Sequence, residues 1–155
     1  MAMKSKSIDF THPRPAVGAV VFKDNRVLLV KRGNAPAKGL WAVPGGSVML
    51  GETLKQAVAR EVYEETAIRI TVGDPVVTLD SIHRDKDGNV LFHYVIIDFD
   101  ATYISGEPKA GDDADFARWV SEKDLETMVV SEPTRRLLME KYQFGEKTIN
   151  RETYS

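Results

Sequence analysis

The sequence contains no cysteine among its 155 residues. This absence excludes disulfide bonds, thiolate zinc sites and a cysteine nucleophile, and it agrees with a reducing compartment. No stretch approaches about 18 uninterrupted apolar residues, and the opening MAMKSKSIDFTHPRP lacks the apolar core of a signal peptide. We therefore expect a soluble, cytoplasmic protein without a membrane partner.

The chain also lacks an excess of charge of one sign. It has 21 basic and 23 acidic residues, so its formal net charge is −2. Such a balance provides no field that would recruit nucleic acid. The sequence has neither a G-x4-G-K-[ST] loop nor a strand followed by G-x-G-x-x-G, so two common phosphate-binding motifs are absent. We expect a small-molecule partner and no nucleic acid.

Apolar runs and turn residues predict a single domain over 1–155, with a core at about 14–142 and flexible ends. Strands, a helix, strands and a helix follow one another, which favours an α+β sandwich with a mixed sheet between helices. The expected elements are a hairpin over 15–31, a helix over 53–67, a hairpin of 76–83 with 90–101, a strand over 116–120, a helical turn at 121–125 and a helix over 132–142.

Three glutamates crowd together on the first predicted helix. Residues three and four apart are neighbours on a helix, so Glu61, Glu64 and Glu65 adjoin, and each like-charge pair costs about 0.2–0.5 kcal/mol in water. A divalent cation reverses the sign of this interaction, because Mg²⁺ and Mn²⁺ bind clustered carboxylate oxygens together with substrate phosphates. The pattern therefore indicates a metal site.

The helical period gives these carboxylates a direction. At about 100° per residue, Glu61 and Glu65 lie on the side of Leu54 and Val58. We expect the helix to bury its first turns and to turn its last ones toward a cleft. Since an unpaired buried charge is costly, the carboxylates need a partner, which is Arg60, a metal ion or both.

The segment GGSVMLGETLKQAVAREVYEETAI resembles the Nudix box, G-x5-E-x7-R-E-U-x-E-E-x-G-U, where U is aliphatic. The matching residues are Gly46, Glu52, Arg60, Glu61, Val62, Glu64, Glu65 and Ile68. Ala67 stands where the family usually has glycine. Glycine permits a left-handed helix end, which alanine adopts at a cost, so we expect slightly altered helix-end geometry and intact chemistry. The resemblance implies the Nudix fold, an α/β/α sandwich around a mixed β-sheet.

The resemblance also implies hydrolysis of a nucleoside diphosphate derivative by metal-assisted attack of water on phosphorus, with Mg²⁺ (or Mn²⁺) as cofactor. By motif position, Glu61 and Glu65 are the principal metal ligands and Glu64 is a second-site ligand. The carbonyl of Gly45 completes the shell. An ordinary solvated helix face and a simple turn are the alternatives for the glutamates and for the glycines.

Three further roles are implied less directly. Arg60 would orient a glutamate, or it forms only a surface ion pair with Glu64. Glu52 would be a secondary ligand, would hold the loop, or is an ordinary first-turn acid. For the general base, an acid outside the box is expected in the loop before the last sheet strand. Asp113 is the preferred candidate, with Asp112 and Asp115 nearby, and a solvated acidic turn is the alternative.

Candidate substrate-binding residues lie around the box. Arg14, Arg32 and Lys38 are placed to meet phosphates, although basic residues at strand ends are commonly only solvated. Gly46 allows close approach of phosphate to the backbone. Trp41 stacks on a base or packs beneath the catalytic loop.

Outside the box, RPAVGAVVF, HRDKDGNVLFHYVIIDF and ARWV resemble the bacterial ADP-ribose pyrophosphatase-like Nudix subgroup. The resemblance favours ADP-ribose or a nucleoside diphosphate sugar as substrate. An ordinary or oxidised nucleoside triphosphate is the alternative, and a non-catalytic nucleotide-binding regulator is a third possibility. The family also implies a possible homodimer, in which the strand FHYVIIDF would cross the interface.

Overall fold

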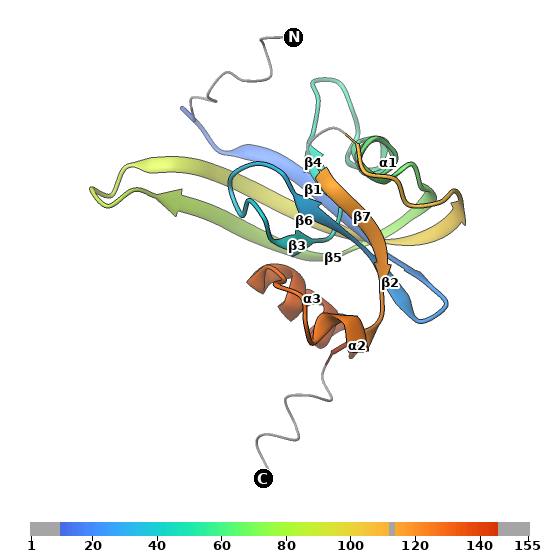
Figure 1. Cartoon of the computed structure of the whole chain (residues 1–155). Helices are drawn as coiled ribbons and strands as arrows, with labels where there is room; N and C mark the ends of the chain where they lie inside the picture. Colours follow the sequence, from blue (N-terminus) through green and yellow to red (C-terminus); the bar gives the residue numbers. More distant parts are fainter. Residues whose placement is uncertain (1–9, 112–113, 146–155) are drawn as a thin grey trace.

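The computed structural model describes residues 10–111 and 114–145. A twisted mixed sheet lies between helix α1 (Leu54–Thr66) on one face and helices α2 (Glu122–Leu125) and α3 (Glu132–Tyr142) on the other (Figure 1). This arrangement confirms the predicted α+β class and the α/β/α sandwich. The positions of α1 and α3 on opposite faces give the sheet two separate cores.

The N-terminal hairpin forms as predicted. Strand β1 (Arg14–Lys23) pairs antiparallel with β2 (Arg26–Arg32), and both turn residues, Asp24 and Asn25, have positive φ. Two consecutive positive φ angles fit the tight turns that match strand twist. Strand β1 also pairs in parallel with β6 (Val90–Ser105), so it lies inside the sheet.

The second hairpin is longer than predicted. Strand β5 runs over Arg69–Arg84 and pairs antiparallel with β6, whereas the expected strand began at about residue 76. The register shifts between Val72 and Pro75, and again between Pro75 and Val77. Proline and bulges interrupt the alternation on which sequence prediction depends, and this explains the missed seven residues. The outer half of this hairpin projects from the sheet as an arm (Figure 1).

Two very short strands were also missed. They are β3 (Trp41–Ala42), which pairs with β2, and β4 (Gly45–Ser47), which pairs with β1. Strand β7 (Ala114–Val120) pairs with β2 and contains the predicted strand 116–120. Helix α3 begins after Ser131 with Pro133 in its first turn, as predicted, but Ser131 makes no side-chain capping hydrogen bond.

Helix α1 has the predicted start. Thr53 accepts a hydrogen bond from the Gln56 N–H, and the Gln56 side chain accepts one from the Thr53 N–H, which forms a capping box. At its other end Ala67 adopts φ 63° and ψ 13° and donates to the Tyr63 carbonyl. Alanine therefore takes the left-handed conformation that glycine usually supplies, and the expected change in helix-end geometry is not seen.

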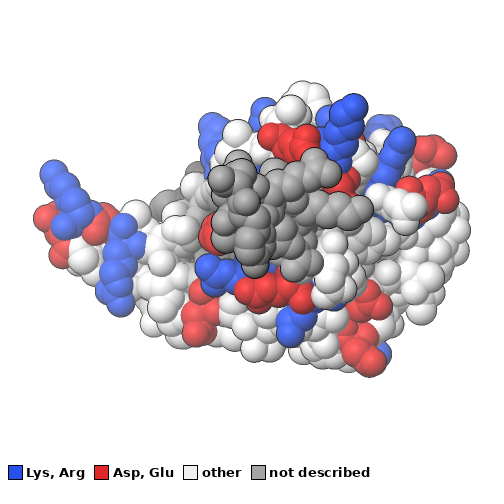
Figure 2. Space-filling model, turned by 90° about the horizontal axis from the view of Figure 1, so that it is seen from below, with Lys and Arg blue, Asp and Glu red and all other residues white. Residues whose placement is uncertain are grey.

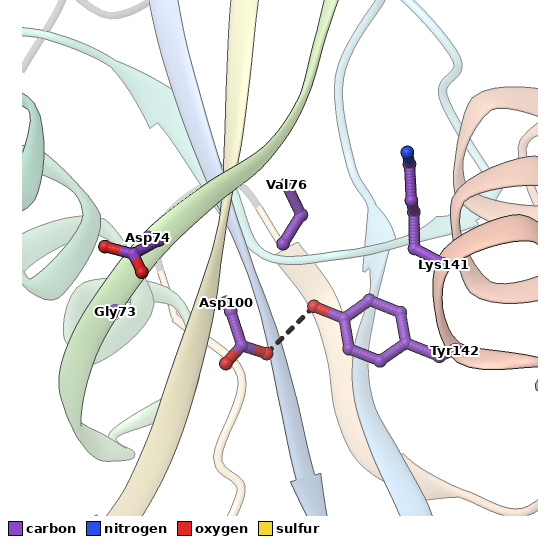
Figure 3. A pocket seen from close by; sticks show the side chains of 6 residues that line it. All are labelled: Gly73, Asp74, Val76, Asp100, Lys141 and Tyr142. Atoms are coloured by element: carbon purple, nitrogen blue, oxygen red, sulfur yellow. Dashed lines mark hydrogen bonds between the residues drawn. The ribbon is translucent and has the colours of Figure 1, made fainter.

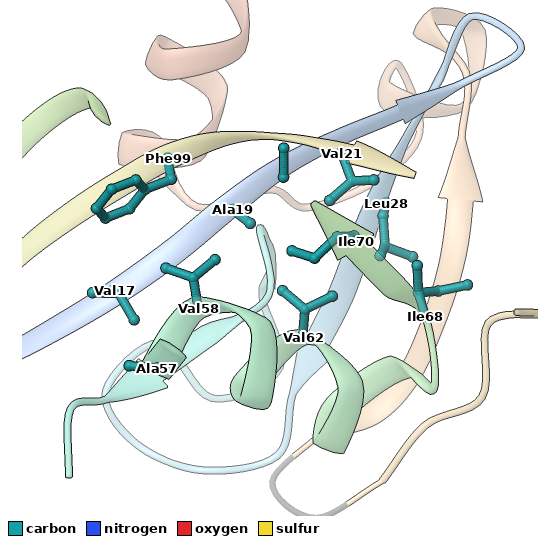
Figure 4. Packing of buried hydrophobic residues seen from close by; sticks show 11 residues of the cluster. Val17, Ala19, Val21, Leu28, Ala57, Val58, Val62, Ile68, Ile70 and Phe99 are labelled. Carbon is teal, nitrogen blue, oxygen red and sulfur yellow. The ribbon is translucent and has the colours of Figure 1, made fainter. Parts of the chain in front are cut away.

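The core beneath α1 fixes the helix on the sheet. Val58 and Val62 point toward Val17 and Ala19 of β1 and Ile70 of β5 (Figure 4). Burying each valine contributes about 1.5–3 kcal/mol. The expectation that the first helical turn is buried is wrong, because Leu54 is 38% exposed, whereas the later positions 58, 62 and 65 are buried. The burial begins at residue 57, one turn later than expected.

Both signs of charge occur across the face seen in Figure 2, where acidic and basic side chains are interspersed. The projecting arm carries both signs at its tip. Within the described residues, no helix has the length and apolar character needed to cross a membrane. The mixture of both signs of charge on this face agrees with the balanced charge in the sequence.

Candidate active site

Strand β4 places two glycines directly against helix α1. Gly45 pairs with Gly18 of β1, and a Cβ at Gly45 would overlap the Val17 carbonyl oxygen. A Cβ at Gly46 would overlap the carboxylate of Glu61. Only glycine permits both approaches without displacing the neighbours. The pairing of β4 with β1 thus brings the backbone of Gly45 and Gly46 to the glutamates. We call these two residues the glycine turn.

Arg60 forms ion pairs with three of the four box glutamates. Its Nε and Nη2 donate to the two oxygens of Glu52, at 2.6 Å and 2.9 Å, in a two-pronged ion pair. Its Nη1 donates to Glu61 Oε1 at 2.7 Å and to Glu64 Oε2 at 3.2 Å. Nη2 also donates to the Ser47 carbonyl at 3.0 Å. Arg60 therefore ties the helix to the loop before it.

The ion pair determines the ionisation of Glu52. Hydrogen bonds from the Arg60 guanidinium and from the Met49 N–H lower the pKa of Glu52 to about 2, although burial opposes this shift. Hydrogen bonding to Glu52 correspondingly raises the pKa of Arg60. The side chain of Glu52 is only 14% exposed, so this pair is more sheltered than an ordinary surface salt bridge.

Glu65 is the most buried carboxylate of the box. It is 4% exposed, and its Oε1 accepts a hydrogen bond from the Gly45 N–H at 2.7 Å. This bond joins the last turn of α1 to the first residue of β4. Glu61 and Glu65 therefore both lie against the Gly45–Gly46 turn, as their motif positions suggested.

The donor chemistry at this turn fits a hard divalent cation. Carboxylate oxygens lie beside a backbone turn with no side chain to fill the space, and such oxygens are the ligands that Mg²⁺ prefers. Among the residues that the structure describes, no three His, Cys, Asp or Glu side chains already converge as a metal-binding group. The positive charge facing three of these carboxylates is Arg60.

The loop before β7 is anchored on the same helix. Lys109 N–H donates to the Thr66 carbonyl at 2.8 Å, and Gly111 N–H donates to the Glu65 carbonyl at 3.1 Å. Asp112 and Asp113, two of the predicted bases, lie outside the described residues. Asp115 belongs to β7. The described residue before the acidic pair is therefore bonded to the helix that carries Glu65.

The predicted substrate-binding residues lie in four different surroundings. Arg32 donates from Nε to the Pro36 carbonyl at 3.0 Å, so it is bonded within its own loop, where Lys38 is exposed. Arg14 begins β1, and its guanidinium lies 5.0 Å from the centre of the Phe10 ring. Gly46 lies at the glutamates. Trp41 is half-buried at the edge of the core beneath α3.

Sequence reasoning missed the backbone groups of the site. The Ser47 carbonyl and the Met49 N–H bind Arg60 and Glu52, and nothing in the identity of those residues indicates such roles. It also missed Phe116, whose ring lies 6.4 Å from that of Trp41. The alternation in FARWV was a usable signal, because Phe116 and Arg118 share one face of that strand.

A hollow of about 460 Å³ lies elsewhere, between the β5–β6 hairpin and the end of α3 (Figure 3). Tyr142 donates from its hydroxyl to Asp100 at 2.9 Å across it. The hollow is on the face of the sheet opposite α1, so it is separate from the glutamates. We place the candidate active site at the glycine turn, where the charged groups converge.

The chain matches a known protein family and several known proteins. The family model described as NUDIX domain matches residues 12–140. An ADP-ribose pyrophosphatase of Methanocaldococcus jannaschii is 42% identical over 116 residues, which cover 75% of this chain and 66% of that protein. A MutT-like protein of Streptomyces ambofaciens is 43% identical over 63 residues, 41% of this chain and 39% of its own length.

A CTP pyrophosphohydrolase of Escherichia coli is 33% identical over 97 residues, 61% of this chain and 70% of its own length. The chain thus spans 66% and 39% of the lengths of the first two relatives. Among solved structures, a MutT NUDIX hydrolase from Burkholderia pseudomallei superposes with a TM-score of 0.70 at 32% identity. That alignment covers 83% of this chain and 98% of the other.

Proposed function

Because the chain belongs to the Nudix family, a family of hydrolases that use divalent metal ions, we propose that it cleaves the pyrophosphate bond of a nucleoside diphosphate derivative. The observation that supports this most is the set of box glutamates gathered at the Gly45–Gly46 turn. The proposed substrates are ADP-ribose or a nucleoside diphosphate sugar, which the M. jannaschii relative favours.

The proposed mechanism assigns a role to each part of the turn. A bound Mg²⁺ or Mn²⁺ would supply positive charge that offsets the charge of the phosphates and would make a water molecule more acidic. Glu61 and Glu65 would hold it, with Glu64 and the Gly45 carbonyl as further ligands. Arg60 orients the glutamates, and Glu52 holds the loop through Arg60 and Met49. Gly46 lets phosphate approach the backbone.

Replacement of Glu65 by glutamine tests the metal site. The amide keeps an acceptor for the Gly45 N–H, so the fold remains, but a negative ligand is lost. We expect the rate to fall by more than about a hundredfold, because loss of even an outer-shell partner of a metal costs about 10–100-fold. Mg²⁺-dependent hydrolysis is measured beside circular dichroism. Glu140→Gln, on α3, is the control, and near-normal activity of Glu65→Gln would refute the assignment.

Asp113 is the proposed general base. The bonding of Gly111 to the Glu65 carbonyl supports a base from this loop, since Gly111, two residues before Asp113, is joined to the helix that carries the glutamates. Alanine variants of Asp112, Asp113 and Asp115 are compared for rate and for metal affinity. The Asp113 variant should lose rate at unchanged metal affinity. If none of the three slows the reaction, a glutamate of the box is the base.

Products distinguish the substrate classes. AMP with ribose 5-phosphate identifies ADP-ribose as the substrate, whereas a nucleoside monophosphate with pyrophosphate identifies a triphosphate. The E. coli CTP pyrophosphohydrolase relative favours the second class as the alternative. A screen with Mg²⁺ and Mn²⁺ covers ADP-ribose, nucleotide sugars, dinucleotides and ordinary and oxidised triphosphates. Tight nucleotide binding without any turnover would favour a regulator instead. We also propose a cytoplasmic homodimer.

A further inference from the structure

The last turn of helix α1 is held by a loop from a distant part of the sequence. A helix leaves its last four carbonyl groups without partners of its own. Here the Glu65 carbonyl accepts a hydrogen bond from the Gly111 N–H at 3.1 Å, and the Thr66 carbonyl accepts one from the Lys109 N–H at 2.8 Å. We call residues 106–111, which lie between β6 and β7 and pass beside α1 (Figure 1), the clamp loop. The clamp loop supplies donors that the helix itself cannot.

The clamp loop fits against the helix end at two glycines. A Cβ at Gly111 would overlap the Glu64 carbonyl oxygen, and a Cβ at Gly106 would overlap the Ala67 carbonyl oxygen. Both oxygens belong to the backbone, so neither can rotate away as the end of a side chain can. Gly106 has a positive φ, whereas Gly111 does not. Alanine at residue 111 would therefore add only one methyl group, and that group would push the loop and the helix apart.

This backbone contact reaches two of the proposed metal ligands. Glu64 and Glu65 both project from the turn that the clamp loop holds. The Glu65 side chain is held on one side by the Gly45 N–H at 2.7 Å, and the Glu65 backbone is held on the other by Gly111. Binding sites work when their groups are kept within about 0.5 Å of the productive geometry. The clamp loop thus fixes the part of the helix on which this geometry depends.

We propose that Gly111 is a positioning residue of the metal site, which acts by holding the backbone of Glu64 and Glu65. This inference rests on the proposed function and deepens it. Loss of the contact has two opposing effects on metal affinity. Displaced ligands weaken binding, by about 10–100-fold when an outer-shell partner is lost. An unpaired carbonyl makes the helix end more negative, which favours a cation by at most about fivefold. Displacement is the larger effect, so the contact strengthens metal binding.

Gly111→Ala tests the proposal through Mn²⁺ binding, measured by electron paramagnetic resonance without substrate. The affinity should fall about tenfold, because the added methyl group separates the loop from the helix end. Gly73→Ala is the matched control. Gly73 also lacks a positive φ, and its Cβ would lie 3.0 Å from the Asp100 carbonyl oxygen, but Gly73 lines the hollow away from the glutamates. The control should bind Mn²⁺ as the wild type does, and circular dichroism checks that both variants are folded.

A double-mutant cycle with Glu65→Gln distinguishes positioning from a general loss of structure. If Gly111 acts through the ligands of the helix end, the effect of Gly111→Ala on Mn²⁺ affinity should shrink once Glu65 is replaced. A general loss of structure would lower the affinity by the same factor in both backgrounds. Equal factors would therefore overturn the proposal.

Amide hydrogen exchange tests the wild type itself, whether or not the variant folds. Coupling between two sites is reciprocal, so a contact that strengthens metal binding is strengthened by the metal. Saturating Mg²⁺ should slow exchange of the Gly111 and Lys109 N–H groups by about tenfold. The control is the Gln143 N–H, which donates to the Met139 carbonyl at 3.2 Å at the end of α3. Its exchange rate should not change.

The proposal is overturned if Gly111→Ala binds Mn²⁺ as tightly as the wild type or more tightly, or if Mg²⁺ leaves exchange of both loop amides unchanged. Either result in a protein that cleaves a diphosphate leaves the proposed hydrolase function standing. Conversely, Gly111-dependent Mn²⁺ binding in a protein that cleaves no diphosphate supports the positioning role and refutes the hydrolase.

Discussion

Arg60 contributes to stability in a pH-dependent way. In the folded protein it lowers the pKa of Glu52 to about 2, below the ordinary value, so the contribution is complete above about pH 4.5 and is lost as the pH falls toward 2. In Arg60→Ala the box carboxylates lose this partner. The melting temperature of the variant should therefore lie well below that of the wild type at pH 7. This difference in melting temperature, the gap, should narrow as the pH falls from 4.5 to 2.

Thermal melts at several pH values measure this gap. Arg136→Ala is a matched control, because Arg136 forms an exposed pair with Glu132 at 3.3 Å on α3. Such surface pairs contribute about 0–1 kcal/mol. The control should show a small gap across the whole range. A difference in melting temperature between Arg60→Ala and the wild type that stays the same at every pH would contradict the role given to Arg60.

Replacement of Gly46 should lower activity much more than stability. The atoms that a Cβ would overlap are those of the Glu61 carboxylate, the far end of a flexible side chain, so Gly46→Ala displaces that carboxylate more than it strains the backbone. We expect at least a tenfold loss of rate, comparable to loss of a metal's outer-shell partner, with a melting temperature close to wild type. Ser47→Ala, on the next, exposed residue, is the control. Equal activity of both variants would argue against Glu61 as a ligand.

At the scale of elements, the end of α1 is strained. Ala67 has φ 63°, and a left-handed conformation costs a residue with a Cβ about 1–2 kcal/mol. Ala67→Gly removes this cost and adds a smaller entropic one, so we expect about 1 kcal/mol of stabilisation and a melting temperature about 2–4 °C higher. Ala59→Gly, inside the same helix, should lose about 1 kcal/mol. A fall in stability for both variants would contradict this account.

Elements with local signals were predictable from the sequence. The capping box of Thr53 and Gln56 fixed the start of α1, and the polar turn at 23–25 fixed the first hairpin. Strands β3 and β4 have two and three residues, too few for any periodicity to appear. Their positions depend on pairing with β2 and β1. The start of β5 was hidden because Pro75 and two register shifts break its alternation.

The same distinction applies to the site. Arg60 and Glu64 lie four residues apart on one helix, so their contact follows from helical spacing and was predictable. The pair of Arg60 with Glu52 joins the helix to the loop before it, and spacing does not reveal it. The approach of Trp41 to Phe116 joins residues 75 positions apart through two different partners of β2, and only the sheet register reveals it. The contact of Gly45 with Glu65 was suggested by the family motif and not by spacing.

At the scale of the whole molecule, the β5–β6 arm has an uncovered apolar face. Ile82 lies opposite His93, between Leu91 and Val95 on the same face of β6, and Leu91 is 48% exposed. An isolated two-stranded ribbon is marginally stable, and such patches mark association sites. We expect a dimer in solution that uses this face, and Leu91→Lys with Val95→Lys should shift it to monomer.

Light scattering after gel filtration measures the mass of each variant. Ile104→Lys, at the other end of β6 and also exposed, should remain dimeric. A monomeric wild type at micromolar concentration would refute the dimer. Monomerisation by Ile104→Lys as well would place the interface elsewhere.

The parallel pairing of β1 with β6 also has a consequence for biosynthesis. Arg14 pairs with Tyr94 and Phe22 with Thr102, so one edge of β1 stays open until most of the chain has left the ribosome. Open strand edges invite pairing with other chains, and contacts between distant segments form slowly. Helix α1 shares its core with Phe99 and Ala101 of β6, so this core is complete only after β6 is made. The interval between synthesis of residues 23 and 102 is therefore when nascent chains of this protein should most need a chaperone.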